Sequence, residues 1–306
     1  MAVSFSKSSG INSGKTRNVI GSINYGNNSV NINYVSAIFT GGTETTISGI
    51  KYSVFKTSTN ITVTSGGFVE AFIVGGGGGG GAFTGGGGGG GGVILWQKIY
   101  LASGTNVITV GALGAASVYP GTGYGSAGGN SSVESLIAYG GGGGSYRVYD
   151  SGRSASGLTQ PPTSPADGGW GGSGGGANSG GGSGGQGIAG QGGNGGKPSI
   201  NGGGGGGYSG SAGTNNTGVN GYNATSTFAS IDASITWVGS GGGGGADNGV
   251  SYSGGTLGGT GNQTTGGGAS GFGNGGGAGG YIPMPTNVAY PGGAGTAGLV
   301  VIRRSI

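Results

Sequence analysis

The sequence predicts a mainly β and irregular protein with essentially no α-helix, in which a small N-terminal β module precedes a layered body of packed polyglycine-II helices framed by β-strands. Three observations lead to this fold class. Glycine supplies 93 of the 306 residues and only 32% are hydrophobic, so an ordinary side-chain core of this size is not expected. No stretch shows sustained helical periodicity. Short apolar, β-branched segments recur directly beside the glycine blocks.

The first 65 residues have a normal glycine content and are rich in Ser, Thr and Asn. Apolar residues alternate with polar ones in three short segments, which are 30–34, 50–54 and 61–63. This period of two predicts antiparallel strands with one polar face. We therefore assign residues 1–65 to an N-terminal β-rich module for attachment or oligomerisation.

Glycine-rich sequence begins at Gly66 and continues to the C-terminus, so we assign residues 66–306 to a glycine-rich body. Its predicted strands are FVEAFIV (68–74), VILWQKIYL (93–101), NVITV (106–110), SVESLIAY (132–139), SITWV (234–238) and LVVIRR (299–304). Several are followed at once by glycine blocks, at 75–81, 140–144 and 241–245. The final segment is expected to be a closing strand.

The glycine blocks allow two interpretations. Glycine-rich sequence on its own is typical of flexible linkers. The alternative is polyproline-II geometry, which has three residues per turn and no internal hydrogen bonds, so that backbone groups of neighbouring helices bond to one another. Because glycine loses the most entropy on ordering, only many such helices packed together would be stable. The short, recurring blocks attached to strands favour the second interpretation, and eight prolines are too few for collagen.

Several chemical functions are excluded or not expected. The chain has no Cys and no His, which removes disulfides, Cys/His zinc sites and histidine catalysis. The segment at 10–16, GINSGKT, is one residue too short for a phosphate-binding loop, and the GxGxxG matches open no helix. Seven scattered acids show no local catalytic pair. We therefore expect no enzyme, no catalytic residue, no metal site and no cofactor.

Charge and targeting signals are equally sparse. The net charge of +4 comes from scattered basic residues, and no arginine stands beside Gly-Gly, so no nucleic-acid partner is expected. The first 15 residues lack the apolar segment of a signal peptide, and no stretch approaches 18 apolar residues. These features predict synthesis in the cytoplasm without export by the secretory route.

The order of strands and glycine blocks resembles a known family. The segments FVEAFIVGGGGGGG, VILWQKIYL, GTNVITVGALG, SLIAYGGGGG, WVGSGGGGG and GTAGLVVIRR resemble the glycine-rich domain of bacteriophage tail-fibre and tail-tip proteins. The same plan is similar to the fibre-tip adhesins of T-even-type phages, whose glycine motifs form a polyglycine-II sandwich. The resemblance covers roughly residues 66–306; the first 65 residues do not match the start of those adhesins.

The resemblance implies a receptor-binding protein of the phage tail, made in the host cytoplasm and located in the virion. Its partners would be a bacterial surface receptor, either an outer-membrane protein or a glycan, and a fibre or tail-tip protein bound through the N-terminal module; a homo-oligomer is also allowed. Such adhesins are implied to grip the host through variable loops between glycine motifs. We carry this role over only to the segments between the glycine blocks.

Aromatic and arginine side chains in those segments suit recognition, because they give large contact areas at low entropic cost. The alternative is that the rings cap the glycine layers and shield them from water, whereas Trp96 and Trp237, inside predicted strands, are expected in the core. The candidate receptor-binding residues are Tyr146, Arg147, Tyr149, Arg153, Trp170, Tyr208, Tyr222, Tyr252, Phe272, Tyr281 and Tyr290.

Three rival functions stay open at this point. A purely structural tail component would share the same scaffold without touching a receptor. An ice-binding protein would use a flat polyglycine face, but it predicts a regular row of Thr or Ala at triplet spacing, and the residues beside the glycines are irregular. A polysaccharide depolymerase would need a catalytic pair assembled from distant loops.

Overall fold

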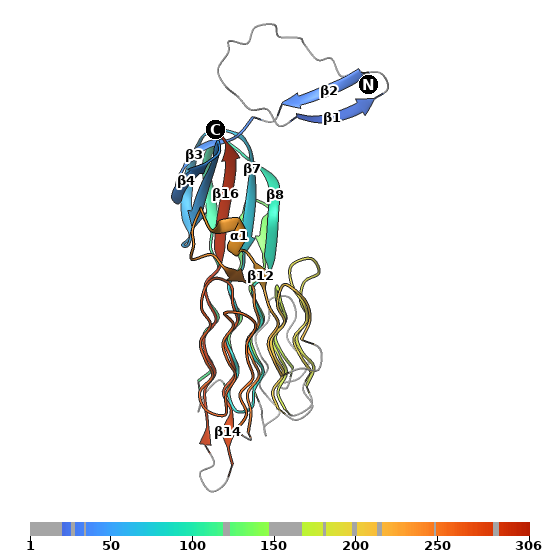
Figure 1. Ribbon diagram of the computed structural model, residues 1–306, viewed down its shortest axis with the longest axis vertical. Coiled ribbons are helices and arrows are strands. Elements are labelled where there is room, and N and C mark those ends of the chain that lie inside the picture. The colour runs from blue at the N-terminus through green and yellow to red at the C-terminus, as the bar shows by residue number, and fades with distance from the viewer. Residues whose placement is uncertain are drawn as a thin grey trace.

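The computed structural model places β-strands at one end of an elongated molecule and extended glycine-rich segments along the rest of its length (Figure 1). Both the N-terminal hairpin and the C-terminus lie at the strand end, and β14 marks the opposite end, which we call the far end. The structure describes residues 20–25, 28–33, 35–118, 123–146, 167–179, 182–197, 201–212, 216–247, 249–283 and 288–306.

Two five-stranded antiparallel sheets form the strand end. The first sheet has the order β11-β10-β9-β6-β3, and the second has the order β4-β5-β16-β7-β8. Their strands are β3 (Ile38–Thr40), β4 (Thr43–Ile47), β5 (Ile50–Phe55), β6 (Thr59–Ser65), β7 (Gly67–Val74), β8 (Val93–Leu101), β9 (Gly104–Thr109), β10 (Ser131–Val133), β11 (Leu136–Ala138) and β16 (Leu299–Ser305).

The main side-chain core lies between these two sheets. Strand β6 shows how the sequence dictates it, since Ile61 and Val63 are buried while their neighbours Thr62 and Thr64 are exposed. The other buried members include Phe39 and Ile108 from the first sheet and Phe55, Ile73, Val300 and Ile302 from the second.

A second core covers the other face of the second sheet. The segment 222–238, which we call the excursion, contributes β12 (Tyr222–Asn223), the single helical turn α1 (Thr225–Phe228) and β13 (Trp237–Val238). Phe228 and Ile235 from this excursion are buried with Phe72, Val74 and Val301 of the sheet. The predicted strand at 234–238 is therefore strand only at its last two residues, because Ile235 follows a turn and enters this core.

The strands before residue 65 share both sheets with strands of the glycine-rich body. β5 pairs with the C-terminal strand β16, and β6 pairs with β9. A separate hairpin, β1 (Ile20–Tyr25) with β2 (Asn28–Asn33), precedes them in the sequence.

The glycine-rich body consists of extended segments outside the sheets, which we call threads, and their hydrogen bonds repeat every third residue. In the thread 75–81, the amides of Gly75, Gly78 and Gly81 donate to the thread 85–92 with N–O distances of 2.9–3.0 Å. The amides of residues 76 and 79 donate to the thread 123–130, and those of residues 77 and 80 donate to the thread 291–298. A period of three is the signature of a threefold extended helix.

The same thread accepts hydrogen bonds from three further neighbours. The carbonyls of residues 76 and 79 accept from the thread 140–146, those of 77 and 80 from the thread 111–118, and those of 78 and 81 from the thread 274–280. The thread 75–81 is thus surrounded by six others, three that it donates to and three that donate to it. Every backbone donor and acceptor from residue 76 to 81 is paired, as burial requires.

Glycine is obligatory at these positions because the threads lie too close for a side chain. A Cβ atom on Gly77 would lie 2.1 Å from the carbonyl oxygen of Asn274, and one on Gly79 would lie 1.9 Å from that of Ala115. The layered polyglycine-II body predicted from the sequence is therefore confirmed. The linker interpretation of 75–92 is wrong, because this segment is the buried centre of the molecule.

Buried polar side chains fasten the threads where they meet the strand end. The Ser131 hydroxyl donates to the Val74 carbonyl at 2.6 Å and accepts from the Gly111 amide at 2.9 Å. The Asn274 side-chain amide donates to the carbonyls of Trp237 and Ser270, and its oxygen accepts from the Ser240 amide. These contacts fix where strands end and threads begin.

Candidate functional site

The two central threads are joined at the far end by a turn of three residues, Ala82, Phe83 and Thr84. Phe83 and Thr84 both have left-handed backbone angles, with φ of 56° and 51°. Two successive non-glycine residues in this region are uncommon and carry strain, which favours a functional or tightly specified role for the turn. The Thr84 side chain is fully buried and its hydroxyl donates to the Phe83 carbonyl at 2.7 Å.

An aromatic cluster surrounds this turn, and we call Phe83, Tyr146 and Tyr281 the far-end cluster. The Phe83 and Tyr281 rings meet edge to face with centroids 4.6 Å apart, and the Phe83 and Tyr146 centroids are 6.2 Å apart. Phe83 is buried, whereas both tyrosine rings are half-buried. Tyr281 begins β14 (Tyr281–Ile282), which pairs with β15 (Val288–Ala289) at the far end (Figure 1).

Hydrogen bonds attach the far-end cluster to the array of hydrogen-bonded threads, which we call the glycine lattice. The Ala82 amide donates to the Gly123 carbonyl at 2.7 Å, and the Phe83 amide donates to the Tyr290 carbonyl at 3.3 Å. The Asn178 side chain donates to the Tyr146 carbonyl. The half-buried rings are thus anchored to threads on several sides.

The candidate residues do not form one surface. Tyr146 and Tyr281 meet through Phe83 at the far end. Tyr208, Tyr222 and Phe272 instead pack against the second core at the strand end, with the two tyrosine ring centroids 5.7 Å apart.

The remaining candidates are half-buried or outside the described residues. The Tyr252 hydroxyl accepts a hydrogen bond from the Asn201 side chain at 2.7 Å. Trp170 is half-buried. Tyr290 is half-buried beside the far-end cluster, where its carbonyl accepts from the Phe83 amide. The candidates Arg147, Tyr149 and Arg153 lie outside the described residues. Phe83 was not among the candidates, although the three non-glycine residues between two glycine blocks mark a turn there.

Trp96 and Trp237, which the sequence predicted in the core, are both half-buried, and Trp96 packs against the second core. Trp96 packs against Phe72 and Phe228 with ring centroids 5.6 and 5.8 Å apart. The Arg303 guanidinium stacks 4.2 Å from the Trp96 ring centre, and its Nε donates to the Glu70 carboxylate at 2.8 Å. These contacts lie on the second sheet at the strand end, away from the far-end cluster.

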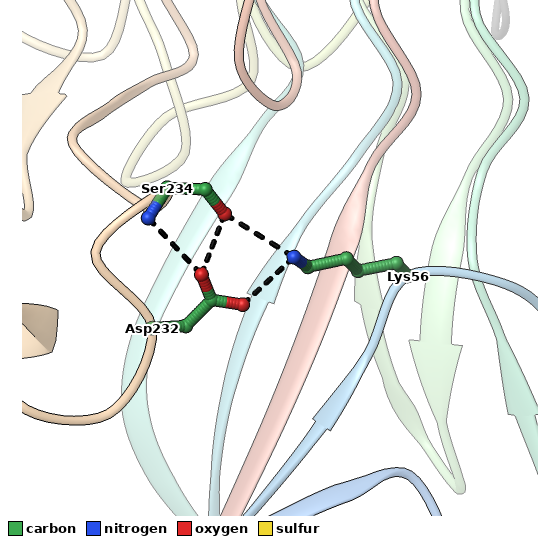
Figure 2. Close-up of polar contacts among 3 residues, drawn as sticks. All are labelled: Lys56, Asp232 and Ser234. Carbon is green, nitrogen blue, oxygen red and sulfur yellow. Dashed lines mark hydrogen bonds and ion pairs between the residues drawn. The ribbon is translucent and has the colours of Figure 1, made fainter.

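A charged group of three residues attaches the excursion to the sheets (Figure 2). Lys56 Nζ lies 2.8 Å from an oxygen of the Asp232 carboxylate and donates to the Ser234 hydroxyl at 3.2 Å. The Ser234 hydroxyl and amide both donate to the other Asp232 oxygen, at 2.6 and 3.0 Å. Burial alone would raise the Asp232 pKa, but the hydrogen bonds from Lys56 and Ser234 and the positive charge of Lys56 outweigh it, so the pKa lies below its ordinary value.

A cavity of about 400 Å³ opens at the strand end between β8, β11 and the turn at 188–191. Ile94, Leu136, Gln191 and Tyr208 are among its lining residues. Both polar atoms of the Gln191 side chain are already bonded to backbone, to the Tyr139 amide and the Ile137 carbonyl. Within the described ranges, no group of three His, Cys, Asp or Glu side chains could hold a metal ion, and no helix is long and apolar enough to cross a membrane.

Comparison with known proteins gives one finding. A family model described as a glycine-rich domain matches residues 53–305. The match begins within β5 and ends at the last residue of β16, so it includes all of β16 and the second half of its partner β5 in the second sheet. No curated protein matches the chain.

Proposed function

Because the chain belongs to the glycine-rich domain family, and because its glycine lattice holds a far-end aromatic cluster, we propose that it is an adhesin: a receptor-binding protein of a bacteriophage tail fibre or tail tip. In this proposal the chain binds and does not catalyse. The observation that carries it is the far-end cluster, in which two half-buried tyrosine rings pack against Phe83 of a strained turn at the end of the molecule opposite the C-terminus.

The lattice supports this role through rigidity. The turn at 82–84 ends two threads whose backbone groups are paired with six neighbours or with each other. A surface ordered before contact loses less conformational entropy when it binds, so the same contact area gives higher affinity. A long, stiff body would also separate the binding end from the attachment end.

We assign one proposed partner to the far end of the molecule and another to the strand end. The half-buried tyrosines Tyr146 and Tyr281 each offer an apolar ring with a polar hydroxyl, which suits either a glycan or a loop of an outer-membrane protein. The strand end, with the N-terminal hairpin, would attach to a fibre or tail-tip protein. The location would then be the virion.

Binding to whole bacterial cells tests the proposal. We expect fluorescently labelled chain to bind saturably to cells of a susceptible strain in a strain panel, and unlabelled chain to compete and to block infection. Tyr281→Ala should weaken binding at least about tenfold, as expected for an aromatic hot spot. The matched control is Tyr100→Ala, which removes an exposed ring at the strand end and should bind like the unchanged chain.

Two results would overturn the proposal: no saturable binding to any strain of the panel, or equal binding by the Tyr281 and Tyr100 variants. A folded far end in the Tyr281 variant would be verified by unchanged amide protection of the thread 75–81. This check separates loss of binding from loss of structure.

A structural tail component without receptor contact is the second candidate. It is favoured by one observation: every candidate ring in the described residues is half-buried, as rings that shield glycine layers from water would be. Electron microscopy of the intact virion with the chain labelled distinguishes the two. An adhesin should occupy an exposed tip, and a structural component should be enclosed between other tail proteins.

A further inference from the structure

One outer thread of the glycine lattice is open on the side that faces solvent. The thread 111–118 continues directly from β9 and bonds to the central thread through the amides of Gly114 and Ser117. On its other side, the amides of Ala112, Leu113, Ala115 and Ala116 have no hydrogen-bond partner among the described residues. The carbonyls of Leu113 and Ala116 also have none there.

These unpaired groups recur at the lattice period. Leu113 and Ala116 are three residues apart, so their free donors and acceptors lie on one side of a threefold helix, about 9.3 Å apart at 3.1 Å per residue. The arrangement is the polyglycine equivalent of the unpaired edge of a β-sheet, which offers backbone groups for pairing with another chain.

The open side of this thread is also apolar. Leu113 is 49% exposed and Val118 is 60% exposed, and Ala112 and Ala115 on either side of Leu113 are exposed as well. Other outer threads carry polar side chains at their exposed positions, such as Ser183, Gln186 and Asn194. Apolar exposure together with free backbone groups therefore distinguishes the thread 111–118.

The same face continues without charge onto the first sheet. Register aligns Thr40, Thr62 and Thr105 across three neighbouring strands, and all three are exposed. Half of the large apolar side chains exposed in the described residues lie on this face, and these are Ile38, Val107, Leu113, Val118 and Ile137. The sequence contains no charged residue between Lys98 and Glu134.

We propose that this face, formed by the thread 111–118 and the outer side of β9, is the interface for a second copy of this chain. The free donors and acceptors need a partner with the same three-residue repeat, and an identical thread supplies both in matching spacing. Because the face carries no charged side chain, two copies meet there without like-charge repulsion even though each chain has a net charge of +4. Pairing would remove the exposed apolar side chains from water.

Sedimentation velocity of the full chain, at concentrations from about 1 to 100 µM where modest interfaces associate, tests the proposal. We expect a dimer at the upper end of this range. The double variant Leu113→Glu with Val107→Glu should raise the dissociation constant at least about tenfold, because it places charges in the contact. The matched control is Val250→Glu, which changes a 42% exposed valine outside this face and should dimerise like the unchanged chain.

Amide hydrogen exchange of the same samples localises the contact. The amides of Ala112, Leu113, Ala115 and Ala116 should exchange rapidly in dilute chain and at least about tenfold more slowly in concentrated chain. The proposal is overturned if the chain stays monomeric throughout, if the double variant associates unchanged, or if these four amides gain no protection when an oligomer forms. Cell binding by the Val107/Leu113 variant is a separate readout, so failure here is distinguishable from failure of the adhesin proposal.

Discussion

At the scale of single residues, glycine in this protein is a steric requirement rather than a source of flexibility. Gly76, Gly77 and Gly79 do not have positive φ angles, so access to left-handed backbone conformations is not what they provide. Glycine is needed at these positions because it has no side chain: a Cβ at each would lie within 2.1 Å of a neighbouring carbonyl oxygen. The glycine blocks identify such positions in the sequence. Which neighbour each glycine faces is invisible there, because an absent side chain leaves no pattern to match.

We predict that Gly79→Ala destabilises the fold by at least about 3 kcal/mol, because backbone on the other thread cannot move aside easily. Urea unfolding should show this loss. The matched control is Gly268→Ala, whose added Cβ would have its nearest heavy atom 3.9 Å away, and which should change stability by less than about 1 kcal/mol. Equal stability of the two variants would contradict the close packing of the threads.

At the scale of elements, the sequence predicted strands well and their partners poorly. FVEAFIV at 68–74 and LVVIRR at 299–304 are strands β7 and β16, as their β-branched residues indicate. Their pairing with each other joins residues more than 200 positions apart, and nothing local specifies it. The segment at 132–139 is two short strands around a turn at Glu134, whose φ of 51° no periodicity reveals.

The excursion that carries α1 depends on the Lys56–Asp232–Ser234 group, so its attachment should depend on pH. The Asp232 pKa is lowered in the folded chain, so its stabilising contribution is complete above the ordinary aspartate pKa of about 3.9 and is lost as the pH falls through the folded value. We expect Asp232→Asn to lower the free energy of unfolding at pH 7 by about 0.2–1 kcal/mol, the range for partly exposed ion pairs.

Urea unfolding at pH 7 and at acidic pH measures this effect. The difference between the unchanged chain and the Asp232 variant should shrink as the pH falls below the folded pKa. Glu134→Gln serves as the control, since Glu134 is exposed and forms no ion pair within the described ranges. A difference that stays constant with pH would show that charge on Asp232 does not hold the excursion.

At the scale of the whole molecule, two different kinds of interior share one chain. Apolar side chains fill the space around the two sheets at the strand end, and backbone hydrogen bonds fill the body. The sequence predicted the second kind from composition and block length. It could not predict which turns gather at the far end, because thread order depends on long-range backbone pairing. The far-end cluster was therefore only partly anticipated, through Tyr146 and Tyr281 but not Phe83.

This mixed interior should have a calorimetric signature. Exposure of apolar surface raises the heat capacity on unfolding and exposure of polar surface lowers it, with ordinary proteins averaging about 12–15 cal/mol/K per residue. Because much of the buried surface here is peptide backbone, we expect a clearly smaller value per residue from scanning calorimetry. An ordinary value would mean that apolar burial dominates the body as well.

The threefold screw of the threads has a consequence for how the chain tolerates changes in length. Adding or removing one residue within a thread turns everything after it by about 120°, so each amide would point at the wrong neighbour. A change of three residues restores the orientation and only slides the turn beyond it outward or inward. Related chains should therefore differ in thread length by multiples of three residues, because only such changes preserve the hydrogen-bonding partners of every thread.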